Sequence, residues 1–141
     1  RVVTDLQLDQ AKVRMDRQRL THAFMNVLLN AIQAMPDGGT LAIQAAVPPP
    51  DRAAATARQP AGPVRSRRAA RIAISDSGPG IPAEHLDRIF EPYFTTKEGG
   101  TGLGLALAHK IIQEHDGSIE VESHAGSGAT FIVRLPVAGS P

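Results

Sequence analysis

The sequence predicts an α/β two-layer sandwich in which a mixed sheet packs against three helices on one face. Three observations support this fold class. Strand-like and helix-like segments follow one another in the order β-α-β, insertion, β-α-loop-α-β-β. The 141 residues are enough for one domain with a proper core. Turns containing glycine, proline and aspartate separate the segments, so each segment can be assigned as an element of its own.

The first half of the chain is expected to form a strand, a long helix and a second strand. Apolar and polar residues alternate over Arg1–Asp9, which is typical of an edge strand. Asp16 is the expected N-cap of a helix over roughly Arg17–Met35, because apolar residues recur there at helical spacing. A proline and a turn with two glycines end this helix. The next expected strand is Thr40–Val47.

The second half is expected to form a strand, two helices around a loop, and a hairpin. The apolar segment Arg71–Ser77 is the strand, and the short helix Pro82–Phe90 begins with proline. The polar stretch Glu91–Gly100 is a loop, and the helix Leu103–His115 ends at an Asp-Gly turn. Ser118–Leu135 forms the hairpin around a glycine-rich turn.

A basic insertion, residues 48–70, separates the second and third expected strands. Pro48–Arg71 holds six arginines, one aspartate and five prolines, a charge of +5, so the remainder carries +1 − 5 = −4. The stretch has no hydrophobic periodicity and its main apolar residue is alanine, which buries too little surface to offset chain entropy. We expect a disordered insertion within a single domain, residues 1–141. The alternative is a basic patch for an acidic partner.

Composition excludes several classes of function. The net charge of +1 argues against a dedicated nucleic-acid surface. The absence of cysteine excludes disulfides, thiolate metal sites and a cysteine nucleophile, and it fits a reducing compartment. No apolar run approaches the ~20 residues of a membrane span. The chain begins with Arg1, so we expect a cytoplasmic fragment without direct membrane contact, compatible with a membrane-anchored parent protein.

A glycine-rich stretch stands directly before the last expected helix. In EGGTGLGLALAHKI, the glycines Gly100, Gly102 and Gly104 let the backbone approach a ligand closely. The first N–H groups of a helix are unpaired and carry the positive end of its dipole, so this stretch is a candidate phosphate site. The alternative is a hinge or a tight turn, because the motif alone is weak.

Three further features add polar groups to this candidate site. Asn26 and Asn30 share a face of the first helix, where their carbonyl oxygens suit a hard cation such as Mg²⁺, although such pairs are more often solvated. Asp76 ends an apolar strand, and a carboxylate there needs donors, such as the amino group of adenine. The alternative for its DSGPGI motif is a plain turn. In AGSGATF, Thr130 is the hydroxyl expected on the pocket wall, unless the motif is only a hairpin turn.

Taken together, NVLLNAIQAM, DSGPGI, IFEPYFTTK, GGTGLGL and GSGATF resemble the ATP-binding catalytic domain of sensor histidine kinases. This is the Bergerat fold, shared with gyrase-type and chaperone ATPases. The resemblance covers about Asp16 to Leu135 except the insertion, and EPYFTTKEGGTGLGLALAHKI looks most like kinases of the nitrogen-regulation type.

The resemblance implies ATP and Mg²⁺ as cofactors and assigns roles to single residues. Asn30 matches a Mg²⁺ ligand, assisted by Asn26, and Asp76 matches the acceptor of the adenine amino group. Lys97 is expected near the phosphates only because of its charge and its position in the sequence. Together with Asn26 and Asn30 it forms the expected set of catalytic residues. The expected nucleotide contacts are Asn30, Asp76, Gly78, Gly80, Ile81, Phe90, Phe94, Thr95, Thr96, Lys97, Gly100, Thr101, Gly102, Leu103, Gly104, Leu105 and Thr130. Gly126 and Gly128 match the last glycine box, beside the adenine.

The resemblance also implies the partners and the reaction. The acceptor histidine of the family lies in a separate dimerisation domain, and none of the five histidines here has its sequence context. The expected partners are therefore ATP, that upstream histidine-phosphotransfer domain, and a response regulator reached through a homodimeric full-length kinase. The loop Tyr93–Gly99 is the expected lid, and Phe94 either contacts the helical hairpin when the lid is open or packs in the core.

One position separates kinase from hydrolase chemistry. The hydrolysing relatives carry a glutamate four residues before the metal asparagine, where this chain has Asn26, which is no general base at neutral pH. Slow hydrolysis and transfer to histidine are expected. The alternatives are a hydrolytic Bergerat ATPase, an anti-sigma serine kinase, both of which normally carry that glutamate, and an interaction module that binds nucleotide weakly or not at all.

Overall fold

The computed structural model describes residues 1–48 and 68–138. In this part of the chain the strands form one sheet of order β1-β2-β3-β5-β4, in which β1 and β2 are parallel and the other neighbours antiparallel. The elements are β1 (Val2–Gln7), α1 (Arg17–Gln33), β2 (Leu41–Ala46), β3 (Ala69–Asp76), α2 (Ala83–Leu86), α3 (Gly104–Glu114), β4 (Ser118–Ser123) and β5 (Ala129–Pro136).

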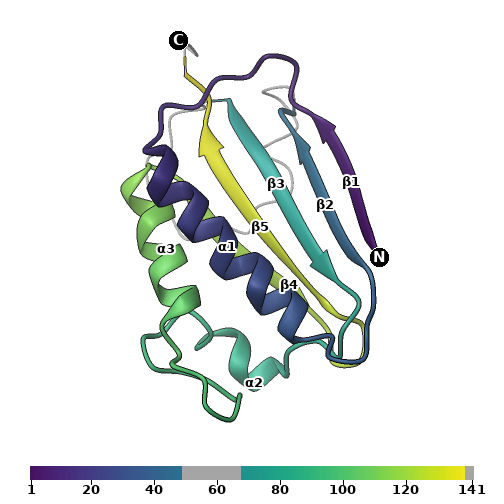
Figure 1. The fold of residues 1–141 in the computed structure, drawn as a ribbon. Coiled ribbons are helices and arrows are strands. Elements are labelled where there is room, and N and C mark those ends of the chain that lie inside the picture. The colour runs from purple at the N-terminus through teal and green to yellow at the C-terminus, as the bar shows by residue number, and fades with distance from the viewer. Residues whose placement is uncertain (49–67, 139–141) are drawn as a thin grey trace.

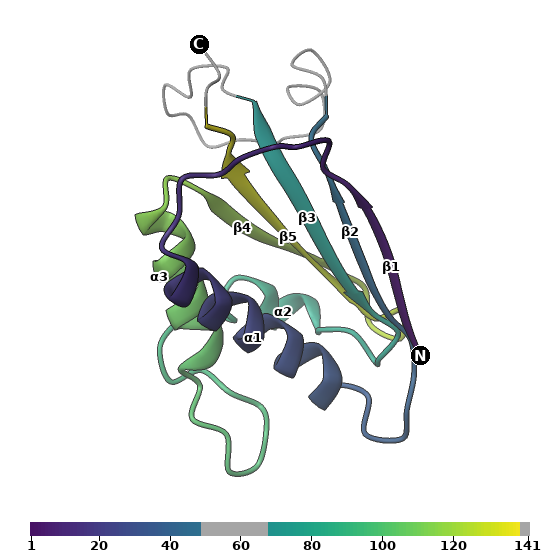
Figure 2. The ribbon, with the colours of Figure 1, turned by 45° about the horizontal axis from the view of Figure 1, so that its top comes forward.

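The predicted two-layer architecture is confirmed. Figures 1 and 2 show α1, α2 and α3 on the same face of the sheet, with α1 and α3 side by side and α2 near one end of the sheet. The element order is the predicted one, and β1 is an edge strand as expected. Asp16 caps α1 as predicted, since its carboxylate accepts a hydrogen bond from the Arg19 N–H at 3.1 Å.

Several element boundaries differ from the prediction, and three of the differences have a clear structural description. Helix α1 ends at Gln33, because the chain must leave the helix before Pro36. Helix α2 is a single turn, after which Arg88 and Glu91 each bond to the carbonyl three residues back, as in tight turns. Strand β3 begins at Ala69 and so takes the last residues of the predicted insertion. Residues 49–67 of that insertion lie outside the described residues, so the disorder predicted for them stays a prediction.

The core lies between the helices and the near face of the sheet. Alternate residues of β5 point into it, and Phe131 and Val133 are fully buried. Alanines face these strands from the helices, and Ala31 of α1 and Ala108 of α3 are also fully buried. Small side chains let the two helices pack closely, which brings the last turns of α1 near the start of α3.

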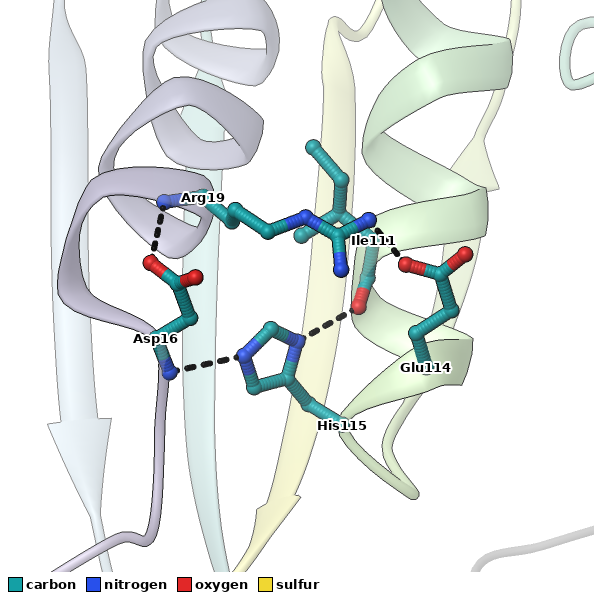
Figure 3. Close-up of polar contacts among 5 residues, drawn as sticks. All are labelled: Asp16, Arg19, Ile111, Glu114 and His115. Atoms are coloured by element: carbon teal, nitrogen blue, oxygen red, sulfur yellow. Dashed lines mark hydrogen bonds and ion pairs between the residues drawn. The ribbon is translucent and has the colours of Figure 1, made fainter.

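A small polar network joins the first turn of α1 to the last turn of α3 (Figure 3). The backbone N–H of Asp16 donates to Nε2 of His115 at 3.0 Å, and Nδ1 of the same ring lies 2.7 Å from the Ile111 carbonyl oxygen. This pairing assigns the ring proton to Nδ1, because Nε2 must accept. An ion pair between Arg19 and Glu114 lies beside it. The network fixes one end of the helix pair.

The histidine should contribute more to stability than the ion pair. His115→Ala removes the acceptor of the Asp16 N–H and is expected to lower the free energy of unfolding by about 1 kcal/mol. Glu114→Gln is the control, because exposed ion pairs are worth less than about 1 kcal/mol, and often nothing measurable. Urea denaturation of both variants measures the difference. Equal losses in the two would contradict this account of the network.

Candidate functional site

The described residues enclose a cavity of about 620 Å³ at one end of the helix pair. Its walls come from the second half of α1, residues 79–82, α2, the loop between Phe94 and Gly102, and the start of α3. A volume of this size accommodates a ligand of ordinary cofactor dimensions. In Figure 1 these elements gather at the lower end of the molecule, where the loop before α3 extends beyond α2.

Most of the predicted site residues line this cavity. They are Asn26, Asn30, Gly80, Ile81, Phe94, Thr95, Thr96, Lys97, Gly100, Thr101, Gly102, Gly104 and Leu105. They come from three segments that are far apart in the sequence, and the fold brings them together. Their contacts with a nucleotide remain predictions.

Asp76 and Gly78 stand directly behind the lining. Asp76 is only 7 % exposed at the end of β3, and its Oδ1 accepts a hydrogen bond from the Gly78 N–H at 2.9 Å. Among the described residues no donor reaches Oδ2, so this oxygen can accept one further hydrogen bond. A Cβ on Gly78 would lie 2.8 Å from the carbonyl oxygen of Ala34, which lines the cavity. The absence of a side chain at Gly78 therefore keeps the end of α1 close to Asp76.

Thr130 does not reach the cavity, which corrects the expectation for this residue. It pairs with Ser75 across β3 and β5, and the two hydroxyl oxygens are 2.8 Å apart. Its neighbours Ala129 and Phe131 point into the core, and successive side chains of a strand point to opposite faces. The hydroxyl of Thr130 therefore lies on the face of the sheet away from the helices.

Two more predicted residues do not line the cavity. Phe90 packs beneath it, with its ring stacked on His109 at 5.2 Å and edge-on to Phe131 at 6.3 Å between centroids. Phe90 is thus partly buried against the core, and its expected contact with a nucleotide stays a prediction. Leu103 directly precedes α3 and is 42 % exposed. Both are apolar side chains, whose direction depends on packing that the motif alone does not specify.

Phe94 takes an intermediate position between the two alternatives. It is half-buried at the edge of the core and lines the cavity. His85 meets its ring edge-on at 5.3 Å, and the Arg88 guanidinium lies 4.6 Å from the ring centroid. These contacts hold the start of the loop against α2.

The ends of the cavity loop are joined to each other. The Tyr93 N–H donates to the Gly102 carbonyl oxygen at 2.9 Å. Gly102 has φ +69°, and a Cβ there would lie 2.4 Å from the carbonyl carbon of Tyr93. The short distance and the positive φ both require glycine at position 102: a Cβ would clash with Tyr93, and residues with a side chain rarely adopt this backbone conformation. The two ends of the loop are therefore held together, and the residues between them extend outward from this point.

Lys97 reaches back from this loop to α1. Its Nζ donates to Asn30 Oδ1 at 3.1 Å and to Gln33 Oε1 at 2.9 Å. Partial burial lowers the pKa of Lys97 below its usual value, and the nearby Asp76 carboxylate offsets only part of this effect. The ammonium is therefore partly shielded from water and lies against two oxygen acceptors, although Lys97 as a whole is exposed.

The start of α3 and Asn26 lie next to each other in the wall of the cavity. No side chain caps α3, and its first turn holds no acidic residue, so its first N–H groups are free to meet an anion. The Oδ1 atom of Asn26 is 3.5 Å from the position that a Cβ on Gly104 would occupy. Its Nδ2 is buried without a hydrogen-bond partner among the described residues. A buried donor without an acceptor is costly, so a ligand oxygen or a water fits here.

Sequence reasoning missed several lining residues. Gln33 follows Asn30 by three positions, and the shared helix face was a signal that could have found it. His85 lines the cavity from α2, where nothing in the sequence distinguished it from a surface histidine. The remaining unpredicted lining residues are Leu29, Ala34, Pro79, Pro82, Ile89 and Gly99.

The chain was compared with protein-family models and curated proteins. Residues 15–139 match the family described as histidine kinase-, DNA gyrase B-, and HSP90-like ATPase. Sensor histidine kinase ZraS of Escherichia coli K12 is 41% identical over 126 residues, which cover 89% of this chain and 23% of that protein. Sporulation kinase C of Bacillus subtilis is 36% identical over 129 residues, covering 92% and 26%. The chain thus spans about a quarter of these relatives.

Solved structures give the same result for the fold. The catalytic domain of histidine kinase ThkA is similar with a TM-score of 0.74 and 31% identity, over 96% of this chain and 77% of that one. Full-length ShkA in complex with AMPPNP has a TM-score of 0.75 over 99% of this chain and 26% of its own, at 23% identity, which shows likeness of fold alone. Within residues 1–48 and 68–138, no helix has the length and apolar character needed to cross a membrane.

Proposed function

Because this chain belongs to the family of histidine kinase-, DNA gyrase B- and HSP90-like ATPases, we propose that it binds Mg-ATP in the cavity and donates the γ-phosphate to a histidine on a separate domain. Its relatives are sensor histidine kinases, and the chain corresponds to their ATP-binding catalytic domain. The observation that carries the proposal is the cavity itself, where Asn30, Lys97 and the uncapped start of α3 face one another beside the buried Asp76.

The base and the phosphates would use different parts of this cavity. Adenine fits against Gly80 and Ile81, where Asp76 Oδ2 is the acceptor for its amino group. The triphosphate fits between α1 and the N–H groups of Gly104 and Leu105, which complement negative charge. This assignment matches polar groups of the nucleotide to polar groups that lack other partners.

The residues around Asn30 suit Mg²⁺ bound together with a nucleotide. Among residues 1–48 and 68–138, no three His, Asp or Glu side chains cluster as a metal site. Mg²⁺ commonly takes one or two protein oxygens, with water and phosphate oxygens completing its octahedron. The Asn30 oxygen already holds a cationic group, the ammonium of Lys97. When bound, Mg²⁺ would neutralise charge on the transferred phosphoryl group.

The lining favours transfer over hydrolysis. None of the described residues that line the cavity carries a carboxylate, and Asn26 cannot take a proton from water at neutral pH. A neutral imidazole needs no such help: its nitrogen attacks the γ-phosphorus, the bond to the bridging oxygen breaks, and ADP leaves. The phosphoryl group would pass from ATP to the acceptor domain and then to a response regulator. The parent protein that holds these domains would be a homodimer.

Transfer is tested by supplying the acceptor in trans. The domain is incubated with γ-labelled ATP and Mg²⁺, alone and with the dimerisation domain of its parent protein. We expect label on the acceptor histidine only, and slow release of phosphate by the domain alone. An acceptor domain without that histidine is the control. Label on one of the five histidines of this chain, or rapid hydrolysis without acceptor, would contradict the proposal.

A further inference from the structure

The contact between Lys97 and α1 closes the cavity loop onto the helix. Lys97 lies in the loop whose base is fixed by the Tyr93–Gly102 bond, and its Nζ bridges the side-chain oxygens of Asn30 and Gln33. These two residues are three positions apart, so their side chains leave the same face of α1. The ammonium thus joins the free part of the loop to the helix that carries the proposed cation ligand.

The ammonium stands where a cation is expected. The oxygen that it contacts at 3.1 Å is Oδ1 of Asn30, the same oxygen that is proposed to bind Mg²⁺. The Lys97 ammonium and Mg²⁺ would compete for this oxygen. Each cation loses contacts with water when it enters the cavity and needs a protein oxygen in their place. The contact to Gln33 Oε1 at 2.9 Å is the part of the arrangement that Mg²⁺ does not need.

We propose that Gln33 is a positioning residue: with Asn30 it holds Lys97 as an internal cation, latching the loop to α1 until Mg-nucleotide takes Asn30. The latch itself follows from the contacts above, whereas the exchange with Mg²⁺ rests on the proposed function. Once Asn30 is taken, Gln33 keeps the ammonium within the cavity, near the phosphates that it then contacts. The latch also weakens apparent Mg²⁺ binding, because the latched population must first open.

The latch is tested without nucleotide by hydrogen exchange of the loop amides, residues 95–101, measured by mass spectrometry. Gln33→Leu removes one of two hydrogen bonds to a charged group, and we expect exchange roughly threefold to tenfold faster. Gln33→Glu keeps an acceptor and adds charge, so it should restore or exceed the protection of the native protein. Gln113→Leu makes the same change at an exposed position of α3 and should leave the loop unchanged.

A double-mutant comparison separates the latch from a general effect on α1. In a Lys97→Met background, where loop exchange is already fast, Gln33→Leu should have no further effect. A merely structural role of Gln33 predicts that its effect persists in that background. Loop exchange that is unchanged by Gln33→Leu in the native background overturns the latch.

The exchange with Mg²⁺ is tested by titrating Mg²⁺ into the domain with a fixed concentration of a non-hydrolysable ATP analogue, followed by calorimetry. Gln33→Leu should lower the Mg²⁺ concentration at half-saturation about threefold or more, because the latched state no longer competes. An unchanged or higher midpoint overturns this competition. Absence of any analogue binding overturns the proposed function instead, and the hydrogen-exchange result still decides the latch.

Discussion

Asp76→Asn is expected to weaken binding of an ATP analogue by roughly a hundredfold, about 3 kcal/mol. The native carboxylate can accept on both oxygens: Oδ1 accepts from the Gly78 N–H, and Oδ2 is the proposed acceptor for the adenine amino group. An amide must turn its NH₂ toward one of these donors, so one hydrogen bond becomes a donor–donor contact in either orientation. At 7 % exposure, water cannot easily relieve this conflict.

Calorimetry with ATP and GTP analogues measures this effect and provides an internal control. Guanine presents an oxygen where adenine has its amino group, so the native carboxylate should disfavour GTP. The NH₂ of the introduced amide could donate to that oxygen, so we expect the variant to lose most of the preference for ATP over GTP. Circular dichroism should confirm that the variant is folded. An unchanged dissociation constant for the ATP analogue would refute the assignment of Asp76.

Gly128→Ala is expected to lower the free energy of unfolding by about 3–5 kcal/mol, compared with about 1 kcal/mol for Gly126→Ala. The two glycines belong to the same hairpin turn and have φ of +77° and +85°, so the backbone strain of a side chain is similar. A Cβ on Gly126 meets nothing within 4 Å, whereas one on Gly128 would lie 2.0 Å from the Asp76 carbonyl oxygen. Only Gly128→Ala therefore forces β3 and β5 apart.

Urea denaturation of the two variants gives the comparison, and ATP-analogue binding gives a second measurement. Because the clash falls on the residue that is expected to bind adenine, Gly128→Ala should also weaken binding under conditions where the protein is folded. Equal destabilisation by the two substitutions would mean that backbone strain, not the contact with Asp76, explains why glycine is found here.

The sequence predicted elements well where the signal was local. The helical spacing of Leu20, Val27 and Ala31 and the cap at Asp16 both specify α1 within a few residues. Contacts over long sequence separation were not predictable. Nothing in the sequence pairs the Asp16 N–H with His115, 99 positions away, or Lys97 with Gln33. Such contacts depend on where the packed helices place their ends.

The error at Thr130 was avoidable from the sequence. Phe131, Val133 and Leu135 have the same parity, and all three point into the core. A strand with this pattern places Thr130 on the opposite face. A motif that runs along a strand cannot place all of its side chains in one pocket, because alternate residues face opposite sides of the sheet. Phe90 differs, because an aromatic residue in a short turn has no such periodicity to indicate its direction.

The hydrogen bond between Tyr93 and Gly102 has a consequence for engineering. It joins the two ends of the intervening segment by backbone groups, as in an Ω-loop, so this closure does not depend on the side chains within the loop. Residues inserted between those anchors add little closure entropy, since that cost rises only with the logarithm of length. Segments of other lengths or compositions could therefore be grafted at this point to alter the exchange of bound and free ligand while the rest of the scaffold is retained.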